Sequence, residues 1–145
     1  RAWMGEDSFD FSFSGLKSAV LNYLNKAAMK GEAVCAADVA ASFQQAVLDV
    51  LVQKTVHAAV ANKVDTILLA GGVAANGTLR EQLQRAAKEA GISVYYPPVQ
   101  FCTDNAAMIG AAAHYKAVQG DYADLSLNAV PNLSFEKLLL ERNEN

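Results

Sequence analysis

The chain is poor in the residues from which self-contained metal sites and disulfide frameworks are built. Its 145 residues include only two cysteines and two histidines. Cys35 and Cys102 are too few for a disulfide framework and too widely spaced for a CxxC pair, so we expect two thiols. His57 and His114 do not form an HExxH pair, and no GxSxG motif is present. A self-contained zinc protease or serine hydrolase is therefore disfavoured.

Long hydrophobic runs and an excess of positive charge are also missing. No stretch approaches the roughly 18 consecutive apolar residues of a membrane span, and the start of the chain does not resemble a signal peptide. We therefore expect no membrane partner and a cytoplasmic location. Lys and Arg number 12 against 15 Asp and Glu, which gives a formal net charge of −3. Independent capture of nucleic acid is disfavoured, because nonspecific affinity comes from many Lys and Arg contacts to phosphate.

Apolar residues, in contrast, are abundant. They make up 52% of the chain, whereas charged residues make up 19%. A chain of this composition and length can hold a core without a disulfide or metal, and no internal repeat or long linker divides it. Because it begins at Arg1 rather than Met, we expect it to be a piece of something longer.

Hydrophobic spacing predicts a helix-rich α/β lobe with short strands. The expected strands cover residues 9–13, 66–70 and 92–96, and the expected helices cover about 14–31, 38–62, 76–91 and 103–120. Ser14 and Asp38 are expected to cap the first two helices. The third begins either at Asn76 or at a capping box over residues 78–81. Thr103 or Asp104 is expected to open the last.

The turn after the strand at 66–70 is the most informative local feature. It has the sequence AGGVAAN over residues 70–76. Gly71 and Gly72 would let the backbone approach a ligand closely, and the following helix N-terminus offers free N–H groups to an anion. The pattern is therefore a candidate nucleotide site. It is also what any tight strand-to-helix turn uses, and it lacks the Rossmann and Walker spacings.

Two further polar clusters have a local explanation as well as a functional one. Asp104, at a helix start, could be an oxygen ligand to a metal ion or simply a cap. Ser12, Ser14 and Lys17 could form part of a pocket wall, or be a strand end, a cap and a solvated lysine. Cys102 has no His or Asn pattern around it, which favours a buried small hydrophobe over a nucleophile.

Three stretches, taken in order, resemble one known family. They are DFSFSGLKSA at 10–19, AGGVAANGTLR at 70–80 and FCTDNAAMI at 101–109. Together they are similar to the C-terminal part of the tRNA N6-adenosine threonylcarbamoyltransferase family, formerly called O-sialoglycoprotein endopeptidase or glycoprotease. The resemblance implies the actin, sugar-kinase and Hsp70 superfamily, with a nucleotide between two lobes. Residues 1–145 would be the C-terminal lobe, helix-rich with a short mixed sheet.

The resemblance also implies an activity and a set of site residues. Members are acyltransferases that move a threonylcarbamoyl group from threonylcarbamoyl-adenylate to N6 of the adenosine following the anticodon. By motif, Asn76 would bind the adenylate, and Gly71 and Gly72 would flank the nucleotide. Asp104 would ligate one Fe²⁺ or Zn²⁺ ion together with two histidines of an HxxxH motif in the first lobe. No HxxxH occurs here, so we expect this chain alone to be inactive and to bind metal weakly or not at all.

Partners and alternatives follow from the same resemblance. The implied partners are tRNA, threonylcarbamoyl-adenylate and, in bacteria, a paralogous inactive subunit and a small ATPase. Apolar residues facing the missing lobe would favour self-association. Two other functions stay open, a noncatalytic scaffold lobe of the same superfamily and a metallo-glycoprotease as the older family name states.

Overall fold

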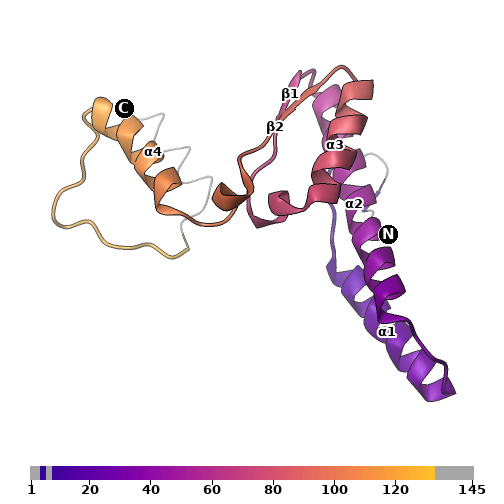
Figure 1. The fold of residues 1–145 in the computed structure, drawn as a ribbon. Coiled ribbons are helices and arrows are strands. Elements are labelled where there is room, and N and C mark those ends of the chain that lie inside the picture. The colour runs from indigo at the N-terminus through magenta and orange to yellow at the C-terminus, as the bar shows by residue number, and fades with distance from the viewer. Residues whose placement is uncertain (1–3, 6–7, 133–145) are drawn as a thin grey trace. The chain divides into compact units, whose positions relative to one another are not determined.

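The computed structural model describes residues 4, 5 and 8–132. The chain divides into two compact units, Arg1–Asp104 and Asn105–Asn145. The first unit contains α1 (Ser14–Lys30), α2 (Ala36–Ala61), β1 (Thr66–Leu68), η1 (Gly72–Ala75), α3 (Gly77–Glu89), β2 (Ser93–Tyr95) and η2 (Val99–Phe101), and the second contains α4 (Ala106–Val118) (Figure 1). The expected helix-rich α/β composition is confirmed.

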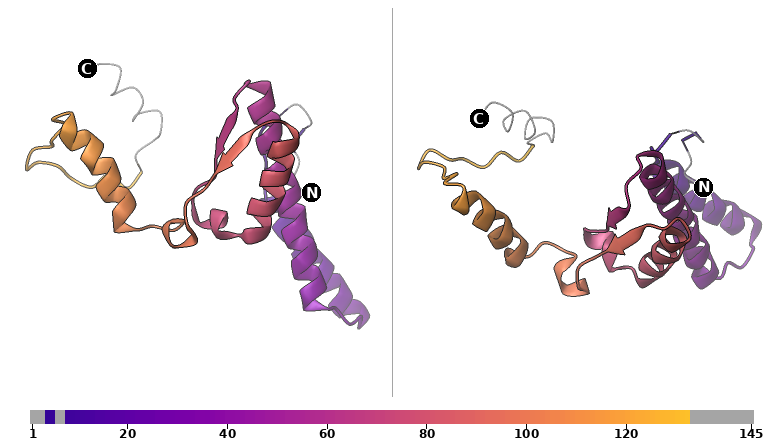
Figure 2. Two further views of the ribbon diagram at one scale, coloured as in Figure 1. Left: turned by 45° about the horizontal axis from the view of Figure 1, so that its top comes forward. Right: turned by 90° about the horizontal axis from the view of Figure 1, so that it is seen from above.

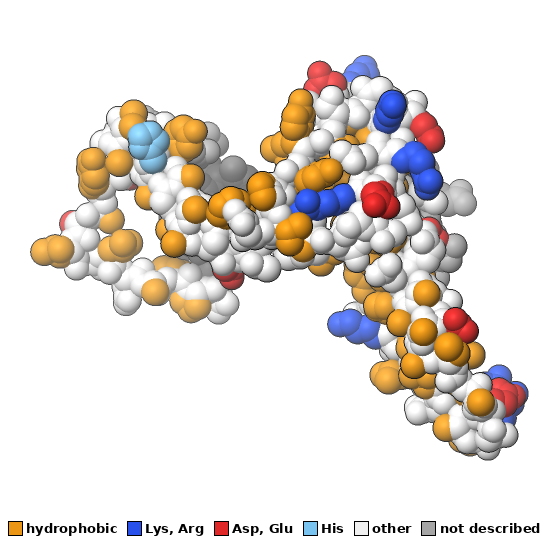
Figure 3. All heavy atoms as spheres, in the orientation of Figure 1, with side chains coloured by type: hydrophobic (Ala, Val, Ile, Leu, Met, Phe, Trp, Pro, Cys, Tyr) orange, Lys and Arg blue, Asp and Glu red, His pale blue; other side chains and the backbone are white. Residues whose placement is uncertain are grey.

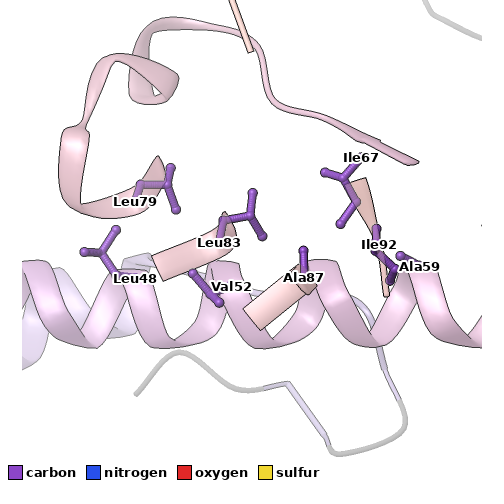
Figure 4. Packing of buried hydrophobic residues seen from close by; sticks show 8 residues of the cluster. All are labelled: Leu48, Val52, Ala59, Ile67, Leu79, Leu83, Ala87 and Ile92. Carbon is purple, nitrogen blue, oxygen red and sulfur yellow. The ribbon is translucent and has the colours of Figure 1, made fainter. Parts of the chain in front are cut away.

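The core of the first unit lies where α3 packs alongside α2 and the two strands (Figures 1 and 2). Leu79, Leu83 and Ala87 are four residues apart on α3, so all three fall on one face of the helix. Each is at most 3% exposed. The cluster is completed by Leu48, Val52 and Ala59 of α2, Ile67 of β1 and Ile92 before β2 (Figure 4). Burial of a leucine such as Leu83 contributes about 1.5–3 kcal/mol.

The two strands form a parallel pair. Thr66, Ile67 and Leu68 of β1 are in register with Ser93, Val94 and Tyr95 of β2, respectively. Helix α3 connects the strands and returns the chain to the same end of the sheet, which is the usual way to make parallel neighbours. The expected mixed sheet is therefore wrong for the described residues, which form a two-stranded parallel sheet.

The expected strand over residues 9–13 is also wrong, because only an isolated bridge at Phe11 occurs there. The backbone carbonyls of this region instead accept from a side chain of α2. Lys54 Nζ donates to the carbonyl oxygens of Gly5 at 3.3 Å, Ser8 at 2.5 Å and Asp10 at 2.6 Å. Lys54 is only 4% exposed, so this region is held by a buried ammonium group rather than by a strand ladder.

Two expected helix caps differ from the structure. Phe13 occupies the N-cap position of α1, and Ser14 is the first helical residue. Helix α2 begins at Ala36, two residues before Asp38, which lies in the first turn. A carboxylate there still favours the helix, because it faces the positive end of the macrodipole. The left-handed end of α1 at Gly31, with φ of 68°, is confirmed.

Apolar side chains are exposed at both ends of the described chain. On α1 the exposed residues include Leu21, Leu24 and Met29. Figure 3 shows hydrophobic side chains gathered over the part of the molecule where α1 and the first half of α2 lie together. Every residue of α4 is exposed. Among the described residues, no helix is both long and apolar enough to cross a bilayer.

Candidate functional site

The glycine turn (residues 71–76) connects β1 to α3. Gly71 has φ of 88° and ψ of 172°, a conformation that disfavours any residue with a Cβ. Gly72 has no such backbone requirement, and a Cβ added there would meet no heavy atom within 4 Å. Neither the backbone nor the packing of the described residues therefore demands glycine at position 72. The surface beside it is open for a close approach by another group.

Asn76 is the N-cap of α3. Its Oδ1 accepts from the backbone N–H of Leu79 at 2.9 Å, so this asparagine, rather than the box at 78–81, caps the helix. Its Nδ2 donates to Oε1 of Gln44 on α2 at 3.4 Å. One end of the amide thus fixes the helix start, while the other makes a long and weak contact with a neighbouring side chain.

Asp104 is the last residue of the first unit, and it is exposed. It does not cap α4, and neither does Thr103. Instead, Asn105 caps the helix, since its Oδ1 accepts from the N–H of Met108 at 3.0 Å. The prediction that Asp104 caps this helix is therefore wrong. The prediction that Asp104 ligates a metal ion is separate and stays a prediction.

A metal ion needs several donors at one place. Among the described residues, no three His, Cys, Asp or Glu side chains gather into a group that could hold one. Asp104 provides a hard oxygen donor of the right chemistry but no second ligand from the described part of the chain. These residues therefore do not fit a complete metal site by themselves.

Arg80 joins the glycine turn to the 97–102 segment, which leads to Asp104. Its Nε donates to the carbonyl oxygen of Ala74 at 2.5 Å. Its Nη2 lies 3.0 Å from both the carbonyl oxygen of Pro97 and Sγ of Cys102. The guanidinium carbon also lies 4.3 Å from the ring centroid of Tyr96.

Sequence reasoning missed both Arg80 and Lys54. One signal was available for Arg80, because a cation in the first turns of a helix opposes the macrodipole and calls for a compensating contact. For Lys54 no comparable signal exists, since lysine on a helix is nearly always exposed. Cys102 was correctly expected to be buried, and it is 4% exposed.

Ser12 lies two residues before α1, and Ser14 and Lys17 lie at its start; all three are exposed. Lys17 lines an apolar groove between α1 and α2, together with residues such as Leu24 and Phe43. The groove is lined by residues of α1 and α2 and includes no residue of the glycine turn. A pocket-wall role for the two serines stays a prediction.

The parallel strand pair, the connecting helix and the glycine turn together define an α/β protein with a strand–glycine–helix junction. By sequence, the chain belongs to the tRNA N6-adenosine threonylcarbamoyltransferase family, whose model matches residues 1–111.

Curated relatives with that name are similar over most of the chain. The relative from Moorella thermoacetica is 59% identical over 133 residues, which cover 92% of this chain and 39% of the relative. The relative from Desulfitobacterium hafniense is 57% identical, with the same coverage of both proteins. The relative from Clostridioides difficile is 54% identical over 94% of this chain and 40% of its own length. The chain thus spans about two fifths of the length of these relatives.

Proposed function

We propose that this chain forms the second, C-terminal lobe of a tRNA-modifying acyltransferase of the actin, sugar-kinase and Hsp70 superfamily. The reaction is transfer of the threonylcarbamoyl group from threonylcarbamoyl-adenylate to N6 of the adenosine that follows the anticodon. The observation that carries the proposal is the open glycine turn capped by Asn76, within a chain that belongs to this family.

The glycine turn supports a role in holding the adenylate. Gly71 and Gly72 leave the surface beside their backbone uncovered, so a nucleotide can approach the main chain. The N-terminus of α3 follows directly, and its N–H groups and positive dipole end favour a phosphate. We assign Asn76 a double role, with its oxygen fixing α3 and its amide nitrogen turning from Gln44 to the substrate. Because the hydrogen bond to Gln44 is long, at 3.4 Å, and therefore weak, Asn76 loses little free energy when its amide nitrogen turns to the substrate.

Asp104 is proposed as one oxygen ligand of an Fe²⁺ or Zn²⁺ ion. The family's remaining ligands are two histidines of an HxxxH motif, which this sequence does not contain. Such an ion, when bound, would polarise the threonylcarbamoyl group as a Lewis acid. The described residues themselves bind and orient the adenylate. We therefore expect the 145-residue chain alone to be inactive.

The partners proposed for the whole protein are tRNA, a paralogous inactive subunit and a small ATPase. The net charge of −3 supports a tRNA-binding surface that lies mainly outside this chain. A cytoplasmic location fits the same substrates.

The test is transfer to unmodified tRNA by the full-length gene product, with synthetic threonylcarbamoyl-adenylate and a parallel metal assay. Wild type is expected to be active. Asp104→Ala is expected to stay folded and to lose both activity and bound metal. Asp121→Ala is the matched control, because Asp121 is an exposed carboxylate paired with Lys116 at 2.9 Å, and it should behave as wild type.

Each other outcome has a clear meaning. Full activity and metal content in Asp104→Ala would remove Asp104 from the site. A folded, inactive wild type that still binds partner subunits would favour the noncatalytic scaffold. Peptide cleavage without tRNA modification would favour the metallo-glycoprotease, for which the described residues offer no complete metal site.

A further inference from the structure

Arg80 connects two segments that are separate in sequence, the glycine turn that contains Asn76 and residues 97–102 that lead to Asp104. Its Nε donates to the carbonyl oxygen of Ala74 at 2.5 Å, inside the glycine turn. Its Nη2 donates to the carbonyl oxygen of Pro97 at 3.0 Å, in the 97–102 segment. Asn76 lies two residues after the first acceptor, and Asp104 lies two residues after Cys102, the end of the second segment.

The surroundings of the guanidinium group favour a fixed orientation. Two of the residues that accept from Arg80 are buried, since Ala74 is fully buried and Cys102 is 4% exposed, and Arg80 itself is half-buried. The planar group also lies over the Tyr96 ring, with 4.3 Å between the guanidinium carbon and the ring centroid. A rigid fork that donates in several directions can hold two backbone segments at once, which the single ammonium centre of lysine cannot do equally well.

The position of Arg80 on α3 also supports a structural role for its contacts. It is the fourth residue of the helix, near the positive end of the macrodipole, where a cation is disfavoured. Its carbonyl and sulfur partners compensate for this position. Arg85, on the same helix, is exposed, as arginine side chains usually are.

We propose that Arg80 is a positioning residue that locks the glycine turn to the 97–102 segment, so that Asn76 and Asp104 act as parts of one site. The inference rests on the proposed function, because only that function requires the two residues together. Arg80 itself touches neither substrate nor metal in this scheme. It acts through the backbone of both segments.

Hydrogen exchange in the full-length gene product tests the lock without any substrate. Reporter amides exist on both sides. In the glycine turn, the N–H groups of Ala74 and Asn76 donate to Gly71 and Val73, and in the 97–102 segment those of Phe101 and Cys102 donate to Pro98 and Val99. Arg80→Met should speed exchange on both sides by about 10-fold or more. The N–H of Ile92, bonded to Ala87 at 2.8 Å, reports on the core and should not change.

Kinetics supply the second readout. Because Arg80 orients groups rather than binding substrate, Arg80→Met should lower kcat by about 10- to 100-fold while KM for the adenylate changes less than about 3-fold. Arg80→Lys keeps the charge but only one donor centre, so it should show a smaller loss of the same kind. Arg85→Met removes an exposed arginine from the same helix and should match wild type in both readouts.

Several results would overturn the inference. Unchanged exchange in both segments, or faster exchange in only one of them, would show that Arg80 does not couple them. An equal increase in the exchange rate at Ile92 would show that Arg80 stabilises the whole core rather than the two segments in particular. If Arg80→Met does not fold, Arg80→Lys decides by the same criteria. A wild type without transferase activity would refute the proposed function, whereas the exchange result would still decide the lock.

Discussion

Helices α3 and α4 have the same length and begin in the same way, yet their surroundings differ. Both contain 13 residues, and each is capped by an asparagine whose side chain accepts from the N–H three residues later, Asn76 for α3 and Asn105 for α4. Helix α3 buries Leu79, Leu83 and Ala87, whereas α4 buries none of its residues. The cap therefore sets where a helix starts but does not determine what covers it.

The amino-acid patterns explain the contrast. The apolar residues of α3 follow a four-residue spacing on one face, with polar residues such as Arg85 and Lys88 elsewhere. Helix α4, with the sequence AAMIGAAAHYKAV, is apolar on most sides. That composition is typical of a helix covered by protein on several faces. Among the described residues, the hydrophobic core cluster contains no side chain of α4.

The largest expected difference comes from shortening one apolar side chain on each helix. In the 145-residue chain, Leu83→Ala should lower the free energy of unfolding by about 2–5 kcal/mol, because it empties a fully packed position. Ile109→Ala, at a position 64% exposed, should change it by less than about 0.5 kcal/mol. Urea unfolding followed by circular dichroism measures both. A similar loss for the two variants would show that α4 is covered in solution.

A lysine pair gives the next largest difference. Lys54→Met should cost about 1–3 kcal/mol, since three backbone carbonyls would lose their charged donor. Lys116→Met breaks only an exposed ion pair with Asp121, worth about 0–1 kcal/mol. The same unfolding experiment compares them. Equal losses would mean that Lys54 contributes no more than a surface lysine.

Removing the Asn76 cap and removing the Asn105 cap should differ mainly in how much of the structure is destabilised. Asn76→Ala should cost about 1 kcal/mol of global stability, because the start of α3 is part of the core unit. Asn76→Asp keeps a capping oxygen and should be nearly neutral. Asn105→Ala should loosen only the first turn of α4, which exchange at Met108 would report. A loss of global stability in Asn105→Ala would contradict this prediction.

The smallest expected effect concerns a turn in the second unit. Hydrogen bonds from the Ser126 hydroxyl and then from its backbone N–H lower the pKa of Asp124. The stabilisation they give is present above the ordinary carboxyl pKa and is lost as pH falls through the lowered value. Ser126→Ala should raise the pKa of Asp124 toward its ordinary value, as measured by NMR titration. An unchanged pKa would assign the shift to the backbone bond alone.

The strongly periodic elements could be predicted from the sequence. The helices α1, α2 and α3 and the short strands lie close to their expected places, because apolar spacing and glycine ends mark them. The strand expected over residues 9–13 failed, since alternation with polar residues does not show whether a neighbouring strand exists. In this region Nζ of Lys54, rather than a neighbouring strand, donates to the backbone carbonyls of Ser8 and Asp10.

The candidate site was only partly visible in the sequence. Asn76 and the glycines were recognisable because a cap and a tight turn have local signatures. The bridge made by Arg80 joins residues 74 and 97, and no pattern along the chain records a contact over that separation. Asp104 was placed at a helix start, but a one-residue difference gave the cap to Asn105.

The small sheet has a further consequence for the chain's behaviour outside a larger assembly. Among the described residues, β1 and β2 pair only with each other, so each strand leaves one edge with unpaired backbone donors and acceptors. Such edges are templates for strand addition. An added strand would continue the β1–β2 ladder, and blocking that edge, for example with a proline, would be the direct way to keep isolated copies apart.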